Sequence, residues 1–143
     1  AKIPHVSARA SLSDFLAVPG TSDSGEISPF YTYENIKFAK PRGSFALKLC
    51  HVALSTYDTY IKLGPWSNEW DSCAAQIVLE EAGGKITDTD GNPVHYNQVN
   101  PKHANGIVAS NGKCHDEIIL KINEYIDSFK ERPEDMITSF KGL

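Results

Sequence analysis

The spacing of hydrophobic residues predicts two helices that each bury one face. In residues 44–57, apolar side chains recur every three or four positions, as they do along one side of a helix. Residues 114–129 repeat this spacing. The first helix begins with a serine, a residue suited to capping a helix N-terminus. The side chains expected to be buried are Leu47, Cys50, Leu54 and Tyr57 in the first helix and Ile118, Ile122, Ile126 and Phe129 in the second.

Shorter apolar runs predict strands. Residues 58–64 alternate between polar and apolar side chains and end at a Gly-Pro turn, and residues 104–110 form a compact apolar run. Residues 3–10 have the composition of a short strand. Two extended runs flank an Asp-Gly pair within residues 83–97, which is typical of a hairpin. Because strands and helices alternate, we expect an α/β fold.

Capping residues and helix breakers divide the remaining chain. Serines at the start of residues 11–18 predict a short helix that ends at a Pro-Gly pair, and residues 21–29 have the composition of a loop. A further helix is expected to begin at Asp71 and to end at a Gly-Gly pair, where the backbone needs a positive φ. A short helix is expected in the tail, residues 131–143.

Composition indicates one domain over residues 1–143. With 41% hydrophobic and 22% charged residues, the chain can bury a core of its own. The formal net charge of −4 argues against a broad nucleic-acid surface, because such surfaces gather lysine and arginine. No apolar run approaches the ~18 residues of a membrane span. We therefore expect neither a nucleic-acid partner nor a membrane partner.

The cysteines indicate the compartment. Cys50, Cys73 and Cys114 form no CxxC pair, and an odd number is unsuited to a disulfide framework. We therefore expect a reducing, cytoplasmic environment.

Asp71 directly follows Trp70 at the predicted start of an apolar helix, and two interpretations of its carboxylate are open. As an N-cap it would accept a backbone N–H at the positive end of the helix dipole, a contribution of about 1 kcal/mol. A helix N-terminus also binds phosphate, and a carboxylate beside it can hold Mg²⁺ against phosphate oxygens. The residue alone favours the cap.

A second helix start and two lysines are further candidates. The N–H groups after Gly43 and the hydroxyl of Ser44 could bind an anion, to which Lys48, one turn later, would add positive charge. An ordinary cap explains the Gly-Ser pair equally well. Lys62 lies in the alternating strand just before a turn. An isolated lysine in such a strand is more often a solvated edge residue than a ligand contact.

Residues 88–93, D-T-D-G-N-P, resemble the start of a calcium-binding loop. Such a loop needs a glutamate near its end, where this chain has Val99. The segment therefore predicts a hairpin turn. The five histidines form no HxxxH or HExxH pattern, so we expect them to be unrelated to a metal.

Three segments taken together resemble a known superfamily. G-S-F-A-L-K-L-C-H-V-A, Y-D-T-Y-I-K-L-G-P and E-W-D-S-C-A-A, the last continuing to E-A-G-G-K-I-T-D-T-D-G-N-P, occur in this order. They are similar to the C-terminal half of the inositol-monophosphatase superfamily of magnesium-dependent phosphatases. The resemblance runs from about residue 6 to residue 129. It implies part of a layered α-β-α-β-α sandwich, with an about five-stranded, mostly parallel or mixed sheet and helices packed on it.

Within this superfamily, the chain most resembles the 3′(2′),5′-bisphosphate nucleotidases, which convert 3′-phosphoadenosine 5′-phosphate to AMP. Lys62 stands where these enzymes tend to carry arginine and where inositol phosphatases carry an acid. The resemblance implies that Lys62 contacts the distal phosphate of the substrate. It implies that Gly43, Ser44 and Lys48 contact the sugar or the phosphates. Asp71 is implied as a Mg²⁺ ligand that also helps to orient the substrate.

Two departures limit what the resemblance implies. The nucleotidases have S-R-S-H on the preceding strand, whereas this chain has A-R-A-S, which keeps Arg9 but lacks the histidine. The first half of the superfamily, with its acidic ligands and the motif D-P-[IL]-D-G-T, does not occur in these 143 residues. Since Mg²⁺ needs several oxygen ligands, Asp71 alone cannot hold it. We therefore expect no complete catalytic site within this chain.

Three functions are therefore open. The chain could be half of a bisphosphate nucleotidase that needs a complementing N-terminal half, or a non-catalytic module that binds phosphate or nucleotide. It could also be part of an inositol-type phosphomonoesterase, which Lys62 argues against. In each case the expected ligand is a small phosphorylated molecule, a nucleotide bisphosphate or an inositol phosphate. A half-domain is also expected to expose an apolar face, and so to form a homodimer or to bind its complementing half.

Overall fold

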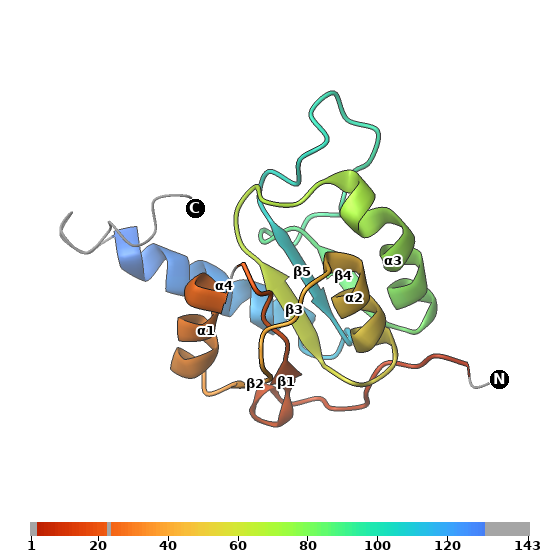
Figure 1. Ribbon diagram of the computed structural model, residues 1–143. Helices are drawn as coiled ribbons and strands as arrows, with labels where there is room; N and C mark the ends of the chain where they lie inside the picture. The colour runs from red at the N-terminus through yellow and green to blue at the C-terminus, as the bar shows by residue number, and fades with distance from the viewer. Residues whose placement is uncertain (1–2, 23, 131–143) are drawn as a thin grey trace.

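The computed structural model describes residues 3–22 and 24–130, and the expected tail helix lies outside these residues (Figure 1). Ten elements follow one another along the described residues. They are a 3-10 helix at Leu12–Asp14, β1 at Leu16–Ala17, α1 at Ser24–Tyr33, β2 at Lys37–Phe38, α2 at Phe45–Ala53, β3 at Thr59–Lys62, α3 at Glu69–Glu81, β4 at Lys85–Thr87, β5 at Ile107–Ser110 and α4 at His115–Lys130.

The strands form one mixed sheet in the order β2-β1-β3-β5-β4. β1 runs parallel to β2 and to β3, whereas β5 pairs antiparallel with β3 and with β4. In the longest pairing, Thr59 lies opposite Ser110 and Lys62 lies opposite Ile107. The expected α/β class and five-stranded mixed sheet are therefore confirmed.

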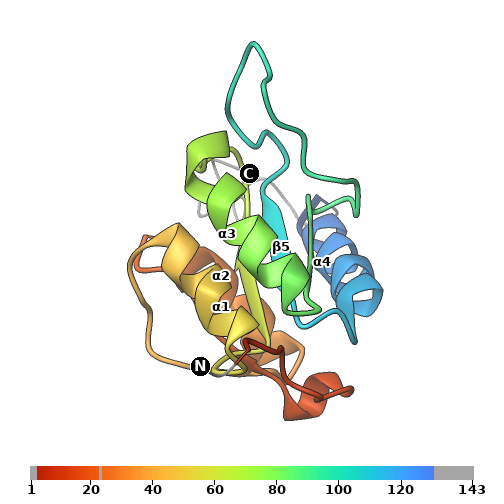
Figure 2. The same cartoon turned by 90° about the vertical axis from the view of Figure 1, so that its right-hand side faces the viewer.

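Helices cover both faces of the sheet. α1 and α4 lie on one face, and α2 and α3 lie side by side on the other (Figures 1 and 2). Because successive side chains of a strand point to opposite faces, Ile61 of β3 enters the core under α1 and α4, and Tyr60 enters the core under α2 and α3. The sheet is thus the middle layer of three.

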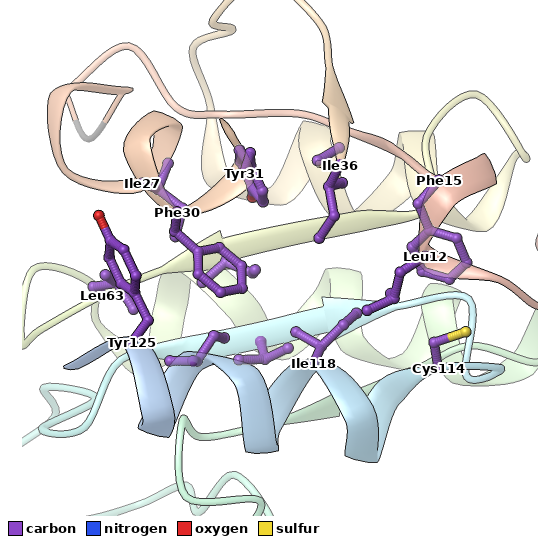
Figure 3. Close-up of a cluster of buried hydrophobic side chains, with 14 residues drawn as sticks. Leu12, Phe15, Ile27, Phe30, Tyr31, Ile36, Leu63, Cys114, Ile118 and Tyr125 are labelled. Atoms are coloured by element: carbon purple, nitrogen blue, oxygen red, sulfur yellow. The ribbon is translucent and has the colours of Figure 1, made fainter. Parts of the chain in front are cut away.

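The core under α1 and α4 confirms the predicted face of the C-terminal helix. Ile118 and Ile122 are fully buried, and Ile126 and Phe129 pack against the same cluster. Figure 3 shows Tyr125 of α4 pointing toward α1, and Ile118 pointing toward Leu12 of the 3-10 helix. The rings of Phe30 and Tyr125 lie 5.4 Å apart, centroid to centroid, in an edge-to-face arrangement.

The predicted buried face of α2 is wrong by about one position. Leu47 and Leu54 are 51% and 57% exposed, and Cys50 is only partly buried, whereas Tyr57, which lies beyond the helix, is buried as expected. The buried face instead consists of Lys48, Leu49, Val52 and Ala53. Leu49, Val52 and Ala53 also recur at helical spacing, so the apolar residues fit two neighbouring faces, and the lysine on the buried one counted against it.

Two expectations for the N-terminal segments, for residues 3–10 and 21–29, are also wrong, and that for residues 11–18 is confirmed only in part. Residues 3–10 form no strand, and residues 11–18 are helical only at Leu12–Asp14 before entering β1. Residues 21–29, expected to be a loop, contain the start of α1. This helix forms despite its polar composition because three of its side chains, Ile27, Phe30 and Tyr31, are buried against the core shared with α4.

The expected hairpin at residues 83–97 has only its first strand, β4. One carboxylate oxygen of Asp88 accepts hydrogen bonds from the N–H groups of Asp90 and Asn92, at 2.9 and 2.8 Å, and closes a turn. The chain then continues to β5 as a long loop without a second strand. β4 takes β5 as its partner instead.

A buried carboxylate holds the N-terminal segment to the sheet. Asp58, just before β3, has no exposed surface and accepts hydrogen bonds from the backbone N–H of Leu16 at 2.7 Å, from Arg9 at 2.8 Å and from Ser7. Arg9 therefore forms an ion pair with Asp58. This structural role accounts for an arginine at this position without a ligand.

Helix α2, with the residue that follows it, and helix α3 expose large apolar side chains. The exposed residues are Leu47, Leu54, Trp70, Ile77 and Val78. Whether a second copy or another segment covers them stays a prediction. In residues 3–22 and 24–130, every helix is too short or too polar to span a bilayer.

Gly106 permits a close approach between the start of β5 and the end of β3. Its φ is +77°, and a Cβ there would overlap the carbonyl oxygen of Lys62 and lie 3.0 Å from the nitrogen of Gly64. We expect Gly106→Ala to lower the free energy of unfolding by more than about 2 kcal/mol, because only the backbone could yield. Chemical denaturation of the 143-residue chain measures this. Gly25→Ala, in α1 with open space around the added Cβ, should be neutral or stabilising. Equal effects of the two substitutions would contradict the interpretation.

His115 makes stability depend on pH. Its ring nitrogens lie 2.8 Å from the hydroxyl of Thr87 and 2.7 Å from that of Ser110, and burial lowers its pKa to about 4, with the Lys85 ammonium adding to the effect. Between pH 6.5 and 4 the unfolded chain therefore binds a proton here that the folded chain does not. Stability should fall as the pH falls through this window, by about 3 kcal/mol in total.

Unfolding free energies of wild type and His115→Gln, measured from pH 7.5 to 4.5, test this dependence. The variant should be the less stable protein at pH 7.5, and the gap should narrow as the pH falls. His95→Gln, at an exposed position, is the matched control and should keep the wild-type slope. Parallel curves for wild type and His115→Gln would show that His115 is not the source.

Candidate functional site

One pocket gathers all five residues that the sequence singled out. Gly43, Ser44, Lys48, Lys62 and Asp71 line a cavity of about 200 Å³ where α2 and α3 begin and β3 ends. The other lining residues are Thr21, Ser22, Phe45, Tyr60, Trp66 and Ser67. Tyr60 could have been found from the sequence, because it precedes Lys62 by two positions and so shares its face of the strand.

The start of α2 forms one wall of the pocket. The hydroxyl of Ser44 accepts the N–H of Leu47 at 3.3 Å, so the expected cap is confirmed. Ser44 has a φ of +57°, which is uncommon outside glycine. A Cβ added at Gly43 would meet nothing within 4 Å. The pocket therefore has room beside the first turn of a helix, where N–H groups have no partner within the helix.

Lys48 brings a buried positive charge to the pocket. The residue is 4% exposed, and its Nζ donates to the carbonyl oxygen of Arg42 at 3.2 Å. The same Nζ lies 4.4 Å from the centroid of the Tyr60 ring. A carbonyl oxygen and an aromatic face both stabilise a cation that has lost much of its water.

Lys62 brings a second buried charge and is not an edge residue. It ends β3, the central strand of the sheet, and is 7% exposed. Its Nζ donates to the hydroxyl of Ser22 at 3.3 Å. The interpretation as a solvated edge lysine is therefore wrong, since a charge buried in a central strand needs partners inside the protein.

Asp71 lies in the first turn of α3, but it is not the N-cap. The helix begins two residues earlier, at Glu69, with Asn68 as its N-cap. The Oδ2 atom of Asp71 accepts the backbone N–H of Asn68 at 2.8 Å, as in a capping box. This bond uses one of the two carboxylate oxygens. A structural role and a ligand role are therefore compatible.

The residues present do not complete a magnesium site. In residues 3–22 and 24–130, no group of three or more His, Cys, Asp or Glu side chains could hold a metal ion. Asp71 is the only acidic residue that lines the pocket within this part of the chain. Since Mg²⁺ takes most of its ligands from oxygen atoms in octahedral geometry, one carboxylate can supply only part of such a site.

The long loop between β4 and β5, for which the sequence analysis predicted no such role, holds the start of α3 in place. The carboxylate of Glu69 accepts the backbone N–H groups of Asn97 and Gln98 at 2.8 and 2.9 Å. The buried hydroxyl of Ser72 lies 2.7 Å from Nε2 of His103. Burial lowers the pKa of His103, so the neutral imidazole is favoured in this contact. We found no sequence signal for this arrangement, because its partners are about thirty residues apart.

Comparison with known proteins places the chain in a family. A model of the inositol monophosphatase family matches residues 3–127. The 3′(2′),5′-bisphosphate nucleotidase CysQ of Aggregatibacter actinomycetemcomitans is 44% identical over 69 residues, which are 46% of this chain and 25% of that protein. A fructose-1,6-bisphosphatase/inositol-1-monophosphatase of Thermotoga maritima is 33% identical over 86 residues, which are 59% of this chain and 30% of that protein.

Solved structures agree with the family model. An IMPase of Thermotoga maritima superposes with a TM-score of 0.72 at 26% identity, covering 87% of this chain and 46% of that one. An inositol monophosphatase from Anabaena gives 0.66 at 30% identity, covering 85% and 48%. The chain thus spans less than half of each of these four proteins. With a family match over nearly its whole length and the same fold, the chain belongs to the inositol monophosphatase family.

Proposed function

We propose that this chain is the phosphate-binding part of a magnesium-dependent phosphatase that removes the 3′-phosphate of 3′-phosphoadenosine 5′-phosphate. The observation that carries the proposal is the convergence of two buried lysines, a helix start and a carboxylate in one pocket. Buried cations that face a cavity are suited to a ligand with anionic groups, because the ligand replaces the water that they lost on burial.

In this proposal, each wall of the pocket has a role. The first turn of α2, with Gly43 and Ser44, takes a phosphate or the sugar through its N–H groups. Lys48 adds charge on the same side. Lys62 binds the distal phosphate, the one that stays on the product. Asp71 orients the substrate from the start of α3.

Two features favour a nucleotide bisphosphate over an inositol phosphate. A second lysine in the pocket suits a second phosphate, whereas an inositol ring hydroxyl would be better served by an acceptor. Trp66 lines the pocket and is 57% exposed, and an exposed aromatic ring can stack on a base for about 1–3 kcal/mol. The named relatives include both nucleotidases and inositol phosphatases, so an inositol-type activity is the alternative.

The proposed magnesium site is shared with another segment. Asp71 would supply one oxygen ligand, and the remaining ligands would come from a complementing N-terminal half. Magnesium, when bound there, supplies a positive charge that stabilises negative charge on the transferred phosphate. This chain's own part is to bind and orient the phosphates. A non-catalytic binding module is the second candidate, favoured by the single carboxylate in the pocket among the described residues.

The first test is binding without metal. We expect the 143-residue chain to bind 3′-phosphoadenosine 5′-phosphate in magnesium-free buffer, measured by isothermal titration calorimetry. Lys62→Met should weaken this binding by about 10- to 100-fold, because a charge-assisted contact with the distal phosphate is lost. The same substitution should change the affinity for adenosine 3′-phosphate little, because this ligand lacks the distal phosphate.

Lys85→Met is the matched control, since this lysine lies in β4 in an exposed pair with Asp116. It should keep the wild-type affinity for both ligands. If Lys62→Met lowers the affinity for both ligands equally, the assignment of Lys62 to the distal phosphate is wrong. A wild-type chain with no affinity for either ligand would contradict the proposed pocket itself.

The second test is complementation. The chain alone should release no phosphate from 3′-phosphoadenosine 5′-phosphate with Mg²⁺, and addition of an N-terminal half from a family member should restore release. Asp71→Asn should lower the restored rate at least ~100-fold, because a neutral amide is a poor magnesium ligand. The variant should stay folded, since the amide oxygen can still accept the N–H of Asn68.

Circular dichroism and denaturation of Asp71→Asn check that its fold is intact. A complemented Asp71→Asn protein with the wild-type rate would show that Asp71 is not a ligand. Lack of restored activity with any family half, together with tight metal-free binding, would favour the non-catalytic module.

A further inference from the structure

Ser67 is a buried residue of the pocket whose hydroxyl has no hydrogen-bond partner. The residue precedes α3, is 2% exposed and lines the cavity together with Lys62 and Asp71. Among the described residues, nothing forms a hydrogen bond with its Oγ. Buried hydroxyl groups nearly always have a partner, so an exception in a binding pocket calls for an explanation.

Backbone hydrogen bonds on both sides of Ser67 fix the position of this residue beside the cavity. The carbonyl oxygen of Ser67 accepts the N–H of His103 at 2.9 Å. The next two N–H groups are also bound, that of Asn68 to Asp71 and that of Glu69 to the carbonyl oxygen of Pro101, both at 2.8 Å. Ser67 is therefore held from both sides. The hydroxyl can rotate, but the residue cannot move out to solvent without breaking these bonds.

Other buried serines in the same fold have satisfied hydroxyl groups. Ser72, one turn into α3, contacts His103 and Tyr96 at 2.7 and 3.0 Å. The hydroxyl of Ser110 lies 2.7 Å from Nδ1 of His115 and accepts the N–H of Gly112 at 3.0 Å. The fold therefore supplies partners for buried serines elsewhere. Ser67 differs in that it borders the cavity.

We infer that Ser67 is a substrate-binding residue, whose hydroxyl donates a hydrogen bond to a phosphate oxygen of the bound ligand. The inference rests on the proposed function and adds a contact to it. The charged neighbours that line the cavity decide the direction of this bond. The ammonium groups of Lys48 and Lys62 draw anionic oxygens into the pocket, and an anionic oxygen can only accept from a hydroxyl.

The inference predicts an unusual pair of effects for Ser67→Ala. The affinity for 3′-phosphoadenosine 5′-phosphate should fall about tenfold, because a hydrogen bond to a charged group is lost. The melting temperature of the ligand-free chain should stay the same or rise, because the variant removes an unsatisfied polar group. A serine with a purely structural role would show the opposite pattern. Calorimetric titration and thermal denaturation of the 143-residue chain measure the two quantities.

Ser110→Ala is the matched control, at the other end of β5 from the pocket. It should lower the melting temperature and leave the affinity unchanged. Wild-type affinity in Ser67→Ala, or a lower melting temperature without weaker binding, would overturn the role of Ser67 and leave the proposed pocket intact. Absence of any binding by the wild-type chain would instead overturn the proposed function, and the inference with it.

Discussion

Burial of β3 on both faces is the constraint on which the rest of the structure depends. The strand lies between β1 and β5, so each of its side chains must enter one of the two helical layers. Ile61 and Leu63 fill one core, and Tyr60 contributes to the other. Tyr60 and Lys62, on the same face of the strand, line the pocket. The same alternation that builds the cores therefore aims Lys62 at the pocket.

The parts of the fold that were predictable are those in which one pattern decides the outcome. The alternation around β3, the apolar run at β5 and the face of α4 required no knowledge of other segments. Five residues of the pocket were found through motif resemblance, and their convergence needed the structure. α1 could not be predicted, because its polar composition conceals three side chains, Ile27, Phe30 and Tyr31, that gain their burial from α4. The buried face of α2 was missed because Lys48 belongs to it.

The two pocket lysines show why hydrophobic patterns fail near binding sites. A pattern treats a charge as a surface residue, yet Lys48 is stabilised by a carbonyl oxygen and the Tyr60 ring, and Lys62 by at least one hydroxyl. Such contacts hold each ammonium group in place. The cost of desolvating the lysines is met while the protein folds, so the pocket is electrostatically prepared before an anion arrives.

The antiparallel pairing of β3 with β5 has a consequence for folding kinetics. Lys62 and Ile107 are neighbours in the sheet, but α3, β4 and the long loop lie between them in the sequence. Closing a loop of this length costs entropy before its contacts are gained, which makes such pairings slow to form. Lys62 lies at the start of the segment that must close, and Asp71 lies within it. The strand that carries Lys62 at its end therefore gains its neighbour on this side only when the chain has closed over the segments in between.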